Sequence, residues 1–230
     1  MNILESLSQD NLRLSNLAQK LDMTVTEASR HLQRLSEVDL ISRNSEGFYC
    51  ITTFGELTLF LLPCLDFVSE NRRYFLDHDI SRLPYEFKNR LSELSNCALN
   101  NDPVIVFGHA RDLLLNAQEY IWLQSYQNLM WNTQIVADKI KQGIDFRFIL
   151  PVDYEKPEEF KPDRDIEQRT KYLESVDVRI LLTDKEASLS FPAKNGQIDY
   201  AAFMSTDPVF RRWCSDLFLK YWEKAQPSVI

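Results

Sequence analysis

The sequence has few glycines and no metal-type spacing of cysteines. Only 5 of the 230 residues are glycine, so no glycine-rich loop that could cradle nucleotide phosphates is present. The four cysteines form no CxxC pair, which leaves no sequence case for structural zinc or a disulfide framework. We expect free, buried thiols in a reducing cytoplasm and no cofactor.

Long apolar runs are also missing. The longest candidate, Leu57 to Val68, contains Pro63 and Asp66 and is shorter than the roughly 20 residues that a membrane-spanning helix needs. The opening segment, Met1 to Asp10, is short and polar and has no signal-peptide pattern. We therefore expect a cytoplasmic protein that makes no use of a membrane.

The chain has no excess of basic residues. Its formal net charge is −8, and the segment from Met1 to Leu62 carries five Lys or Arg against eight Asp or Glu. Non-specific affinity for nucleic acid comes mostly from phosphate neutralisation. A nucleic-acid binder of this charge needs two copies and a specific site.

The segment from Leu12 to Thr53 nevertheless has the order of a winged helix-turn-helix. Its pattern predicts a helix over Leu14–Leu21, a tight turn and a second helix over Thr24–Glu37. A short strand at Leu40 and Ile41, a polar tip over Arg43–Gly47 and a returning strand over Phe48–Ile51 follow. In this arrangement the second helix enters a DNA major groove.

The second predicted helix has one apolar face, formed by Val25, Ala28, Leu32 and Leu35. Thr24 and Glu27 have the spacing of a capping box. Arg and Gln can read base edges, whereas Ser and Thr can hold phosphates. The predicted DNA-binding residues of helix and wing tip are Thr24, Thr26, Ser29, Arg30, Gln33, Arg34, Arg43 and Asn44. Any exposed helix can carry such residues, so a solvated face is the alternative.

The next segment, Thr53–Phe75, has a mostly helical pattern with a kink or break expected near Leu62, ahead of Pro63. Its apolar residues lie on several faces, which is more than one exposed helix can carry. Packing between domains or between subunits would explain this, and we favour a dimerisation helix. A loop over Tyr74–Phe87 and a helix from Pro84 to about Ala98 are predicted next.

The remaining segment alternates between strand and helix patterns, which predicts an α/β domain with a mixed sheet. Strands are predicted at 103–109, 119–124, 144–150 and 176–182, and helices at 112–117, 126–142, 166–175 and 207–224. Segments 187–191 and 198–204 read as a hairpin around Lys194–Gly196, and 151–162 reads as a polar loop.

Two resemblances follow from these residues. Ser29–Leu35 (SRHLQRL) and Asp39–Arg43 (DLISR) resemble the winged-helix domains of ArsR and TrmB-type regulators. The rest resembles archaeal regulators related to the methanogenesis regulator FilR, through FLDHDISRLP at 75–84, AQEYIW at 117–122 and FRRWCSDLFLKYW at 210–222. These resemblances imply an archaeal regulator whose C-terminal domain senses a small molecule or mediates assembly.

The C-terminal segment has a strand at Asp199–Ser205, followed by Asp207 and a helix that carries Trp213, Leu217 and Trp222. This order resembles a phospholipase D-type fold. That superfamily's chemistry uses H-x-K-x4-D, with the histidine as nucleophile. Here the histidines are His31, His78 and His109, and the residues two positions later are glutamine, isoleucine and arginine. The resemblance therefore implies a sensor-like domain without the catalytic motif, and we expect no enzyme activity by that mechanism.

Three further groups of residues are candidate sites. Asp77, His78 and Asp79 could bind a metal in a loop, but an interdomain salt bridge or a capping role is favoured and no metal site is predicted. His109 and Arg111 follow a strand-like run, and strand ends are where α/β domains place ligand contacts. The alternative for His109, which we favour slightly, is a histidine with satisfied hydrogen bonds at a helix start. Trp122 and Trp131 flank Tyr126 and line a pocket or fill the core. The candidate ligand-binding residues are His109, Arg111 and Trp122.

The sequence thus predicts an α+β chain: a winged helix-turn-helix at 1–53, a helical linker or dimerisation region at 54–100 and an α/β regulatory domain at 101–230. The predicted function is a homodimeric transcriptional regulator that binds a double-stranded DNA operator and responds to an unknown small-molecule effector. The alternative is an adaptor whose winged helix binds a protein. A hydrolase with an unrecognised site is a third reading.

Overall fold

The computed structural model describes residues 3–126, 133–154, 164–196 and 199–227. The chain divides into two compact units, Met1–Asp66 (unit 1) and Phe67–Ile230 (unit 2). The boundary lies inside a helix, so the segment 54–100, expected to be a linker, is shared between the units. Both helices and a mixed sheet are present, as the predicted α+β class requires.

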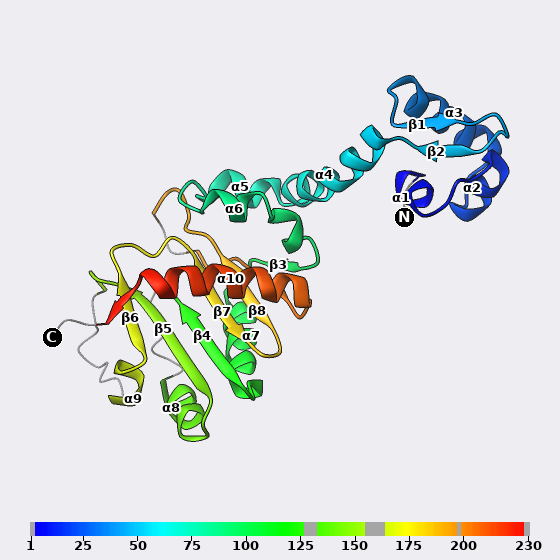
Figure 1. The fold of residues 1–230 in the computed structure, drawn as a ribbon. Coiled ribbons are helices and arrows are strands. Elements are labelled where there is room, and N and C mark those ends of the chain that lie inside the picture. Colours follow the sequence, from blue (N-terminus) through cyan, green and yellow to red (C-terminus); the bar gives the residue numbers. More distant parts are fainter. Residues whose placement is uncertain (1–2, 127–132, 155–163, 197–198, 228–230) are drawn as a thin grey trace. The chain divides into compact units, whose positions relative to one another are not determined.

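Unit 1 has three helices followed by a two-stranded antiparallel sheet and the start of a fourth helix (Figure 1). The elements are α1 (Ile3–Gln9), α2 (Leu14–Lys20), α3 (Val25–Glu37), β1 (Ile41–Arg43), β2 (Tyr49–Ile51) and α4 (Thr53–Glu70). The order of elements expected from the sequence is therefore present. The core of the unit consists of Leu4, Leu7, Leu17, Leu32 and Ile41, each 6% exposed or less.

Two details of unit 1 differ from the sequence expectation. Val25 is 55% exposed rather than buried, because it is the first residue of α3 and lies at the end of the helix rather than over the core. Helix α4 continues through Pro63, so the helix does not break near Leu62 and ends only before Asn71. The side-chain amide of Asn71 donates to the carbonyl of Phe67 at 2.9 Å, which competes with continuation of the helix.

Unit 2 begins with short pieces rather than the long helix expected from Pro84 to Ala98. These are α5 (Arg72–Asp77), α6 (Tyr85–Lys88), a 3₁₀ turn η1 (Leu91–Leu94) and β3 (Ala98–Asn100). The expected single helix is divided into the short α6 and η1. Its expected last residue, Ala98, instead begins a strand that pairs with β9 (Ala202–Ser205), and this tertiary pairing overrides local helical preference there.

The rest of unit 2 alternates helices and strands around one sheet. The elements are α7 (Pro103–Asn116), β4 (Tyr120–Gln124), α8 (Thr133–Lys141), β5 (Asp145–Pro151), α9 (Arg164–Glu167), β6 (Thr170–Leu173), β7 (Arg179–Thr183), β8 (Ala187–Ser190), β9 (Ala202–Ser205), α10 (Pro208–Lys224) and β10 (Gln226–Pro227). The helix predicted over 126–142 is present as α8 from Thr133. Residues 127–132, which include Trp131, lie outside the described residues. The same holds for most of the predicted loop at 151–162.

Two predicted elements of this part have the wrong type. Pro103–His109 is the start of α7 rather than a strand, because Asp102 accepts from the amide of Val104 at 2.9 Å and Pro103 occupies the first turn. The predicted helix over Ile166–Ser175 is instead the end of short α9 followed by β6. Strand β6 pairs in parallel with β5, so sheet formation again decides the structure.

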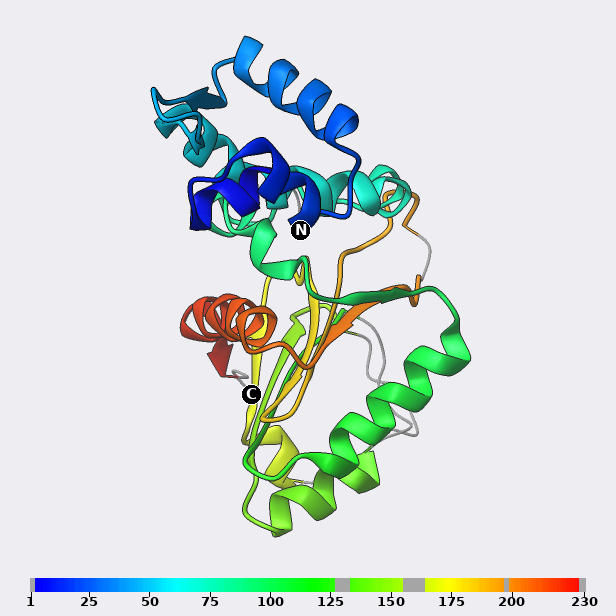
Figure 2. The same cartoon turned by 90° about the vertical axis from the view of Figure 1, so that its right-hand side faces the viewer.

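The sheet has eight strands in the order β10-β6-β5-β4-β7-β8-β9-β3. Strand β5 is parallel to β4 and β6, and the other pairings are antiparallel. The predicted mixed sheet is confirmed. The predicted pairing of 187–191 with 198–204 is present as the antiparallel pair of β8 and β9. Helix α10 covers one face and α7 and α8 cover the other (Figure 2). Alternate residues of β4 serve these two layers: Ile121 packs with α7 and α8, and Trp122 stacks on Phe218 of α10.

Candidate nucleic-acid interface

Helix α3 begins at a complete capping box. The Thr24 hydroxyl accepts from the amide of Glu27 at 3.2 Å, and a Glu27 carboxylate oxygen accepts from the Thr24 amide at 3.0 Å. The hydrogen bonds from Thr24 lower the pKa of the Glu27 carboxyl. Two amides that have no partner inside the helix are thereby satisfied. Thr24, predicted to contact DNA, has its hydroxyl engaged in this box.

The face of α3 that carries the predicted reading residues is open to solvent. Ala28 and Leu32 are fully buried against the unit 1 core. Thr26, Ser29, Arg30, Gln33 and Arg34 are all exposed. Their successive spacings of three, one, three and one residues place them on the side of the helix opposite to Ala28 and Leu32. The Gln33 amide also donates to Glu37 at 2.9 Å, so its orientation is held along the helix.

The β1–β2 turn carries the other two predicted contacts. The Arg43 guanidinium lies over the ring of Tyr49, 5.4 Å from its centroid, and remains exposed. The Asn44 side-chain oxygen accepts from the amides of Glu46 and Phe48 at 3.0 and 2.9 Å. Asn44 therefore shapes the turn, and Arg43 is the cation that the turn presents.

Sequence reasoning missed one cation near this turn. The Arg13 guanidinium lies over the Phe48 ring, 4.7 Å from its centroid. It is brought there by the bridge between Leu12 and Tyr49, whose amides and carbonyls exchange hydrogen bonds of 3.1 and 2.8 Å. These residues are more than 30 positions apart in the sequence, so no local pattern reveals the contact.

The three candidate ligand residues of unit 2 do not come together. His109 lies on α7, where its Nε2 pairs with a Glu186 carboxylate oxygen at 2.8 Å. Trp122 projects from the opposite face of the sheet, where its indole nitrogen donates to Asp145 at 3.0 Å and the Arg147 guanidinium covers its ring. Arg111 is exposed on α7. His109 and Trp122 cannot share one ligand across the sheet.

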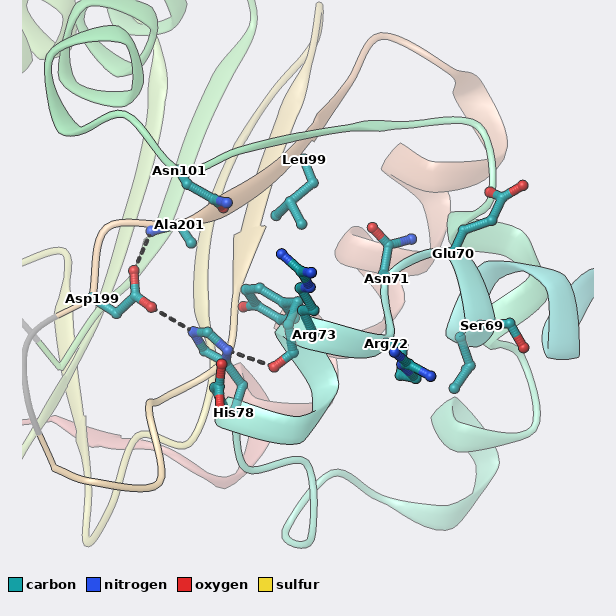
Figure 3. A pocket seen from close by; sticks show the side chains of 13 residues that line it. Ser69, Glu70, Asn71, Arg72, Arg73, His78, Leu99, Asn101, Asp199 and Ala201 are labelled. Atoms are coloured by element: carbon teal, nitrogen blue, oxygen red, sulfur yellow. Dashed lines mark hydrogen bonds and ion pairs between the residues drawn. The ribbon is translucent and has the colours of Figure 1, made fainter.

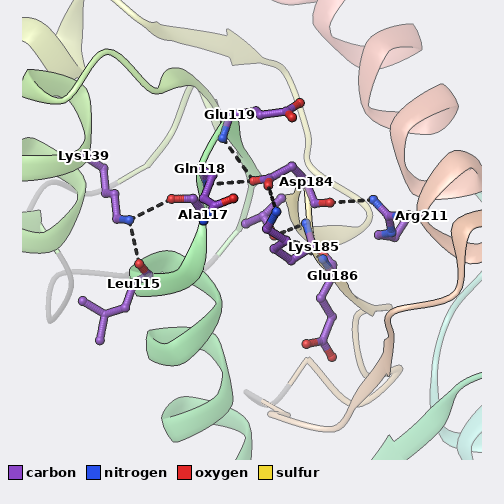
Figure 4. Close-up of polar contacts among 10 residues, drawn as sticks. Leu115, Ala117, Gln118, Glu119, Lys139, Asp184, Lys185, Glu186 and Arg211 are labelled. Carbon is purple, nitrogen blue, oxygen red and sulfur yellow. Dashed lines mark hydrogen bonds and ion pairs between the residues drawn. The ribbon is translucent and has the colours of Figure 1, made fainter.

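The turn that holds Glu186 is joined to neighbouring segments by backbone contacts (Figure 4). An Asp184 carboxylate oxygen accepts from the amides of Gln118 and Glu119 at 2.9 and 3.2 Å. The Arg211 guanidinium donates to the Asp184 carbonyl at 2.9 Å. Lys139 donates to the carbonyls of Leu115 and Ala117 at the end of α7. These contacts hold the start of β4 in place and are structural.

A hollow of about 940 Å³ opens in unit 2 beside α5. His78 forms part of its wall and is only 4% exposed. Its Nδ1 lies 2.7 Å from the Tyr74 carbonyl and its Nε2 lies 2.9 Å from an Asp199 carboxylate oxygen (Figure 3). Its ring stacks on Tyr74 at 3.6 Å between centroids. His78 thus pairs with Asp199 inside unit 2, and the described residues contain no cluster of three metal-ligating side chains.

Comparison with known proteins gave several structural likenesses and no match by sequence. No family model matches the chain, and no curated protein sequence matches it. The chain is similar to the archaeal chromatin protein TrmBL2, whose structure is described as showing a novel mode of DNA binding, with a TM-score of 0.47 and 15% identity over 98% of this chain and 92% of that one. It is also similar to NucT from Helicobacter pylori, with a TM-score of 0.47 and 10% identity over 58% of this chain and 99% of that one. Likeness at this level does not say what this chain binds.

In the described part of the chain, no helix is both long and apolar enough to cross a lipid bilayer.

Proposed function

We propose that unit 1 is a winged helix-turn-helix that binds double-stranded DNA, with α3 in the major groove and the β1–β2 turn against the flanking backbone. The supporting observation is the exposed polar face of α3, which presents Arg30 and Arg34 opposite the buried Ala28 and Leu32. Arginine can bind guanine bidentately, and the spacing of the two arginines matches one helical turn. We further propose that the chain works in the cytoplasm, where the genomic DNA of an archaeal-type cell lies.

The negative charge of unit 1 limits the affinity that one copy can have for DNA. Unit 1 has five Lys or Arg and nine Asp or Glu, a formal net charge of −4. Few phosphates can be neutralised by one copy, so its non-specific affinity is low. Two copies, binding half-sites about 34 Å apart, would gain affinity through simultaneous contacts. We therefore propose a transcriptional regulator that works as a homodimer on a pseudo-palindromic operator.

Unit 2 would supply regulation and no catalysis. The hollow beside α5 offers a place for a small-molecule effector, and its wall combines the exposed Arg72 and Arg73 with Asn71, Asn101 and Asp199. We propose that the chain is a TrmB-type regulator related to FilR. In this proposal unit 2 is phospholipase D-like and lacks the catalytic motif.

The test begins with a search for sites, because the operator is unknown. Purified protein is mixed with sheared genomic DNA, and the retained fragments are sequenced. Enrichment of a common pseudo-palindromic sequence is the expected result. Retained fragments that share no sequence would contradict the proposal of a specific operator. If no DNA is retained, the alternative of a protein partner is favoured, and the acidic charge of unit 1 fits that alternative.

The recovered site then tests the helix. Arg30→Ala combined with Arg34→Ala should weaken binding in a gel-shift assay at least about tenfold, since each good bidentate pair contributes about 1–3 kcal/mol. The matched control is Arg164→Ala with Arg212→Ala, which removes two exposed arginines from unit 2 and should leave binding unchanged. Equal affinity of the two double variants would sink the assignment of α3 to the groove.

A further inference from the structure

Helix α4 exposes a row of large apolar side chains within unit 1. Each of the five is more than half exposed, and the most exposed is 79% accessible. They are Phe54, Leu57, Phe60, Leu61 and Leu65. Isolated exposed apolar residues are common on protein surfaces, but five on one short stretch of helix indicate an interaction surface.

The row lies on the side of the helix that faces away from the unit 1 core. Leu59 and Leu62 pack against that core, and buried Gly55 faces it as well. At about 100° per residue, the five exposed residues fall within an arc of about 140° centred opposite to Leu59 and Leu62. Helix α4 is therefore apolar on two sides, and folding of unit 1 satisfies only one of them.

The spacing along the row is that of a helix packed against another helix. Phe54, Leu57, Leu61 and the half-buried Cys64 are separated by three, four and three residues. This alternation is the seam pattern of paired helices, in which the same face of each helix interlocks with the other. Phe60 and Leu65 widen the row on either side of this seam.

The charge of the helix narrows the choice of partner. Between Phe54 and Leu65 the one charged residue is Glu56, and α4 contains no Lys or Arg. A helix that lies on an anionic membrane surface carries basic residues beside its apolar face, so lipid is a poor match. An identical apolar face imposes no charge penalty and permits the self-complementary contact of a two-fold dimer.

The size of the face also suits a second copy. Five side chains of this kind offer on the order of 500 Å² of apolar surface, against about 800 Å² per partner in a standard interface. The face would thus form the centre of an interface, and the polar margin of the helix would supply its rim.

We propose that α4 packs through Phe54, Leu57, Phe60, Leu61 and Leu65 against the same face of a second copy of this chain. This inference deepens the proposed function, on which its regulatory meaning rests, because it names the contact that joins the two DNA-binding units. The surface itself is defined by the exposure and spacing of α4 residues alone.

The test measures mass in the absence of DNA, so that its outcome is independent of DNA binding. Light scattering over a range of concentrations should give the wild type a mass of about 54 kDa, twice the 27.0 kDa of one chain. Leu57→Glu combined with Leu61→Glu places two charges in the seam and should give about 27 kDa. The matched control is Leu76→Glu with Val104→Glu, two residues of unit 2 that are 63% and 79% exposed, which should stay dimeric.

A second variant guards against a folding defect in the first. Phe60→Ser alters the most exposed member of the row and should weaken the dimer at least tenfold in sedimentation equilibrium, with an unchanged circular dichroism spectrum. A wild type that remains at the mass of one chain at all concentrations would overturn the proposal. A seam variant that stays dimeric would overturn it too. A dimer that binds no DNA would contradict the proposed function only.

Discussion

A Cβ atom added to Gly55 would lie 2.1 Å from the carbonyl oxygen of Leu40. The start of α4 therefore approaches the backbone before β1 more closely than any side chain allows. Thr52 secures the same contact, since its hydroxyl donates to the Asp39 carbonyl at 2.6 Å and accepts from the Gly55 amide at 3.0 Å. Glycine at this position is what lets the helix follow directly from the wing.

Gly55→Ala should accordingly destabilise unit 1. The added methyl group collides with backbone, which cannot move aside as a flexible side chain could, and overpacking of this kind costs about 1–3 kcal/mol. Urea denaturation followed by circular dichroism measures the loss. Gly108→Ala is the matched control: it lies in α7 with nothing within 4 Å of an added Cβ, and should stabilise by about 0.5–1 kcal/mol. Equal behaviour of the two variants would refute the close approach.

The capping box of α3 yields a second prediction. Thr24→Ala removes the hydroxyl that accepts from the Glu27 amide and should lower the free energy of unfolding by about 1 kcal/mol. Thr24→Ser keeps the hydroxyl and should restore most of it. If Thr24→Ser were as damaging as Thr24→Ala, the box would not be the cause.

The pair formed by His109 and Glu186 predicts a pH dependence. The hydrogen bond with Glu186 raises the pKa of His109, against a smaller lowering by burial. A raised histidine pKa in the folded state means that the stabilisation is fully present below the unfolded pKa of about 6.5 and fades as pH rises through the higher folded pKa. The pair should therefore strengthen unit 2 at pH 6 and contribute less at pH 9.

Glu186→Gln measures this contribution directly. The difference in melting temperature between the wild type and this variant should shrink from pH 6 to pH 9. As a control, Glu223→Gln alters an exposed carboxylate on α10 and should give a difference that does not depend on pH in this range. A constant wild-type advantage for Glu186 would show that the histidine does not titrate as described.

The salt dependence of DNA binding follows from the few cations of unit 1. Affinity falls with salt at a slope of about −0.9 for each phosphate neutralised. Five Lys or Arg in unit 1 limit the slope to about −4.5 for one copy and about −9 for two. Arg43→Ala should make it shallower by about 0.9 per copy. An unchanged slope would place Arg43 away from the DNA backbone, and Arg212→Ala in unit 2 serves as control.

Local signals in the sequence determined unit 1 well. The Thr24 and Glu27 box, the apolar positions Ala28 and Leu32 and the polar turn after Arg43 all act over short distances, so their pattern is visible without the fold. The same holds for α10, where Asp207 accepts from two amides at the helix start and the predicted apolar residues, from Phe210 to Tyr221, are buried. The candidate DNA-reading face of α3 also comes from sequence, because helical spacing alone separates it from the core.

Only the tertiary structure decided the elements whose partners are distant in sequence. Ala98–Asn100 and Thr170–Leu173 are strands because β9 and β5 offer them hydrogen bonds, a contribution that no local propensity contains. Three other features also depend on partners that are distant in sequence. They are the contact between Arg13 and Phe48, the separation of His109 from Trp122 by the sheet, and the close approach of Gly55 to Leu40. So is the exposed row on α4: its apolar residues are evident in the sequence, but only the fold shows which of them the unit 1 core leaves uncovered.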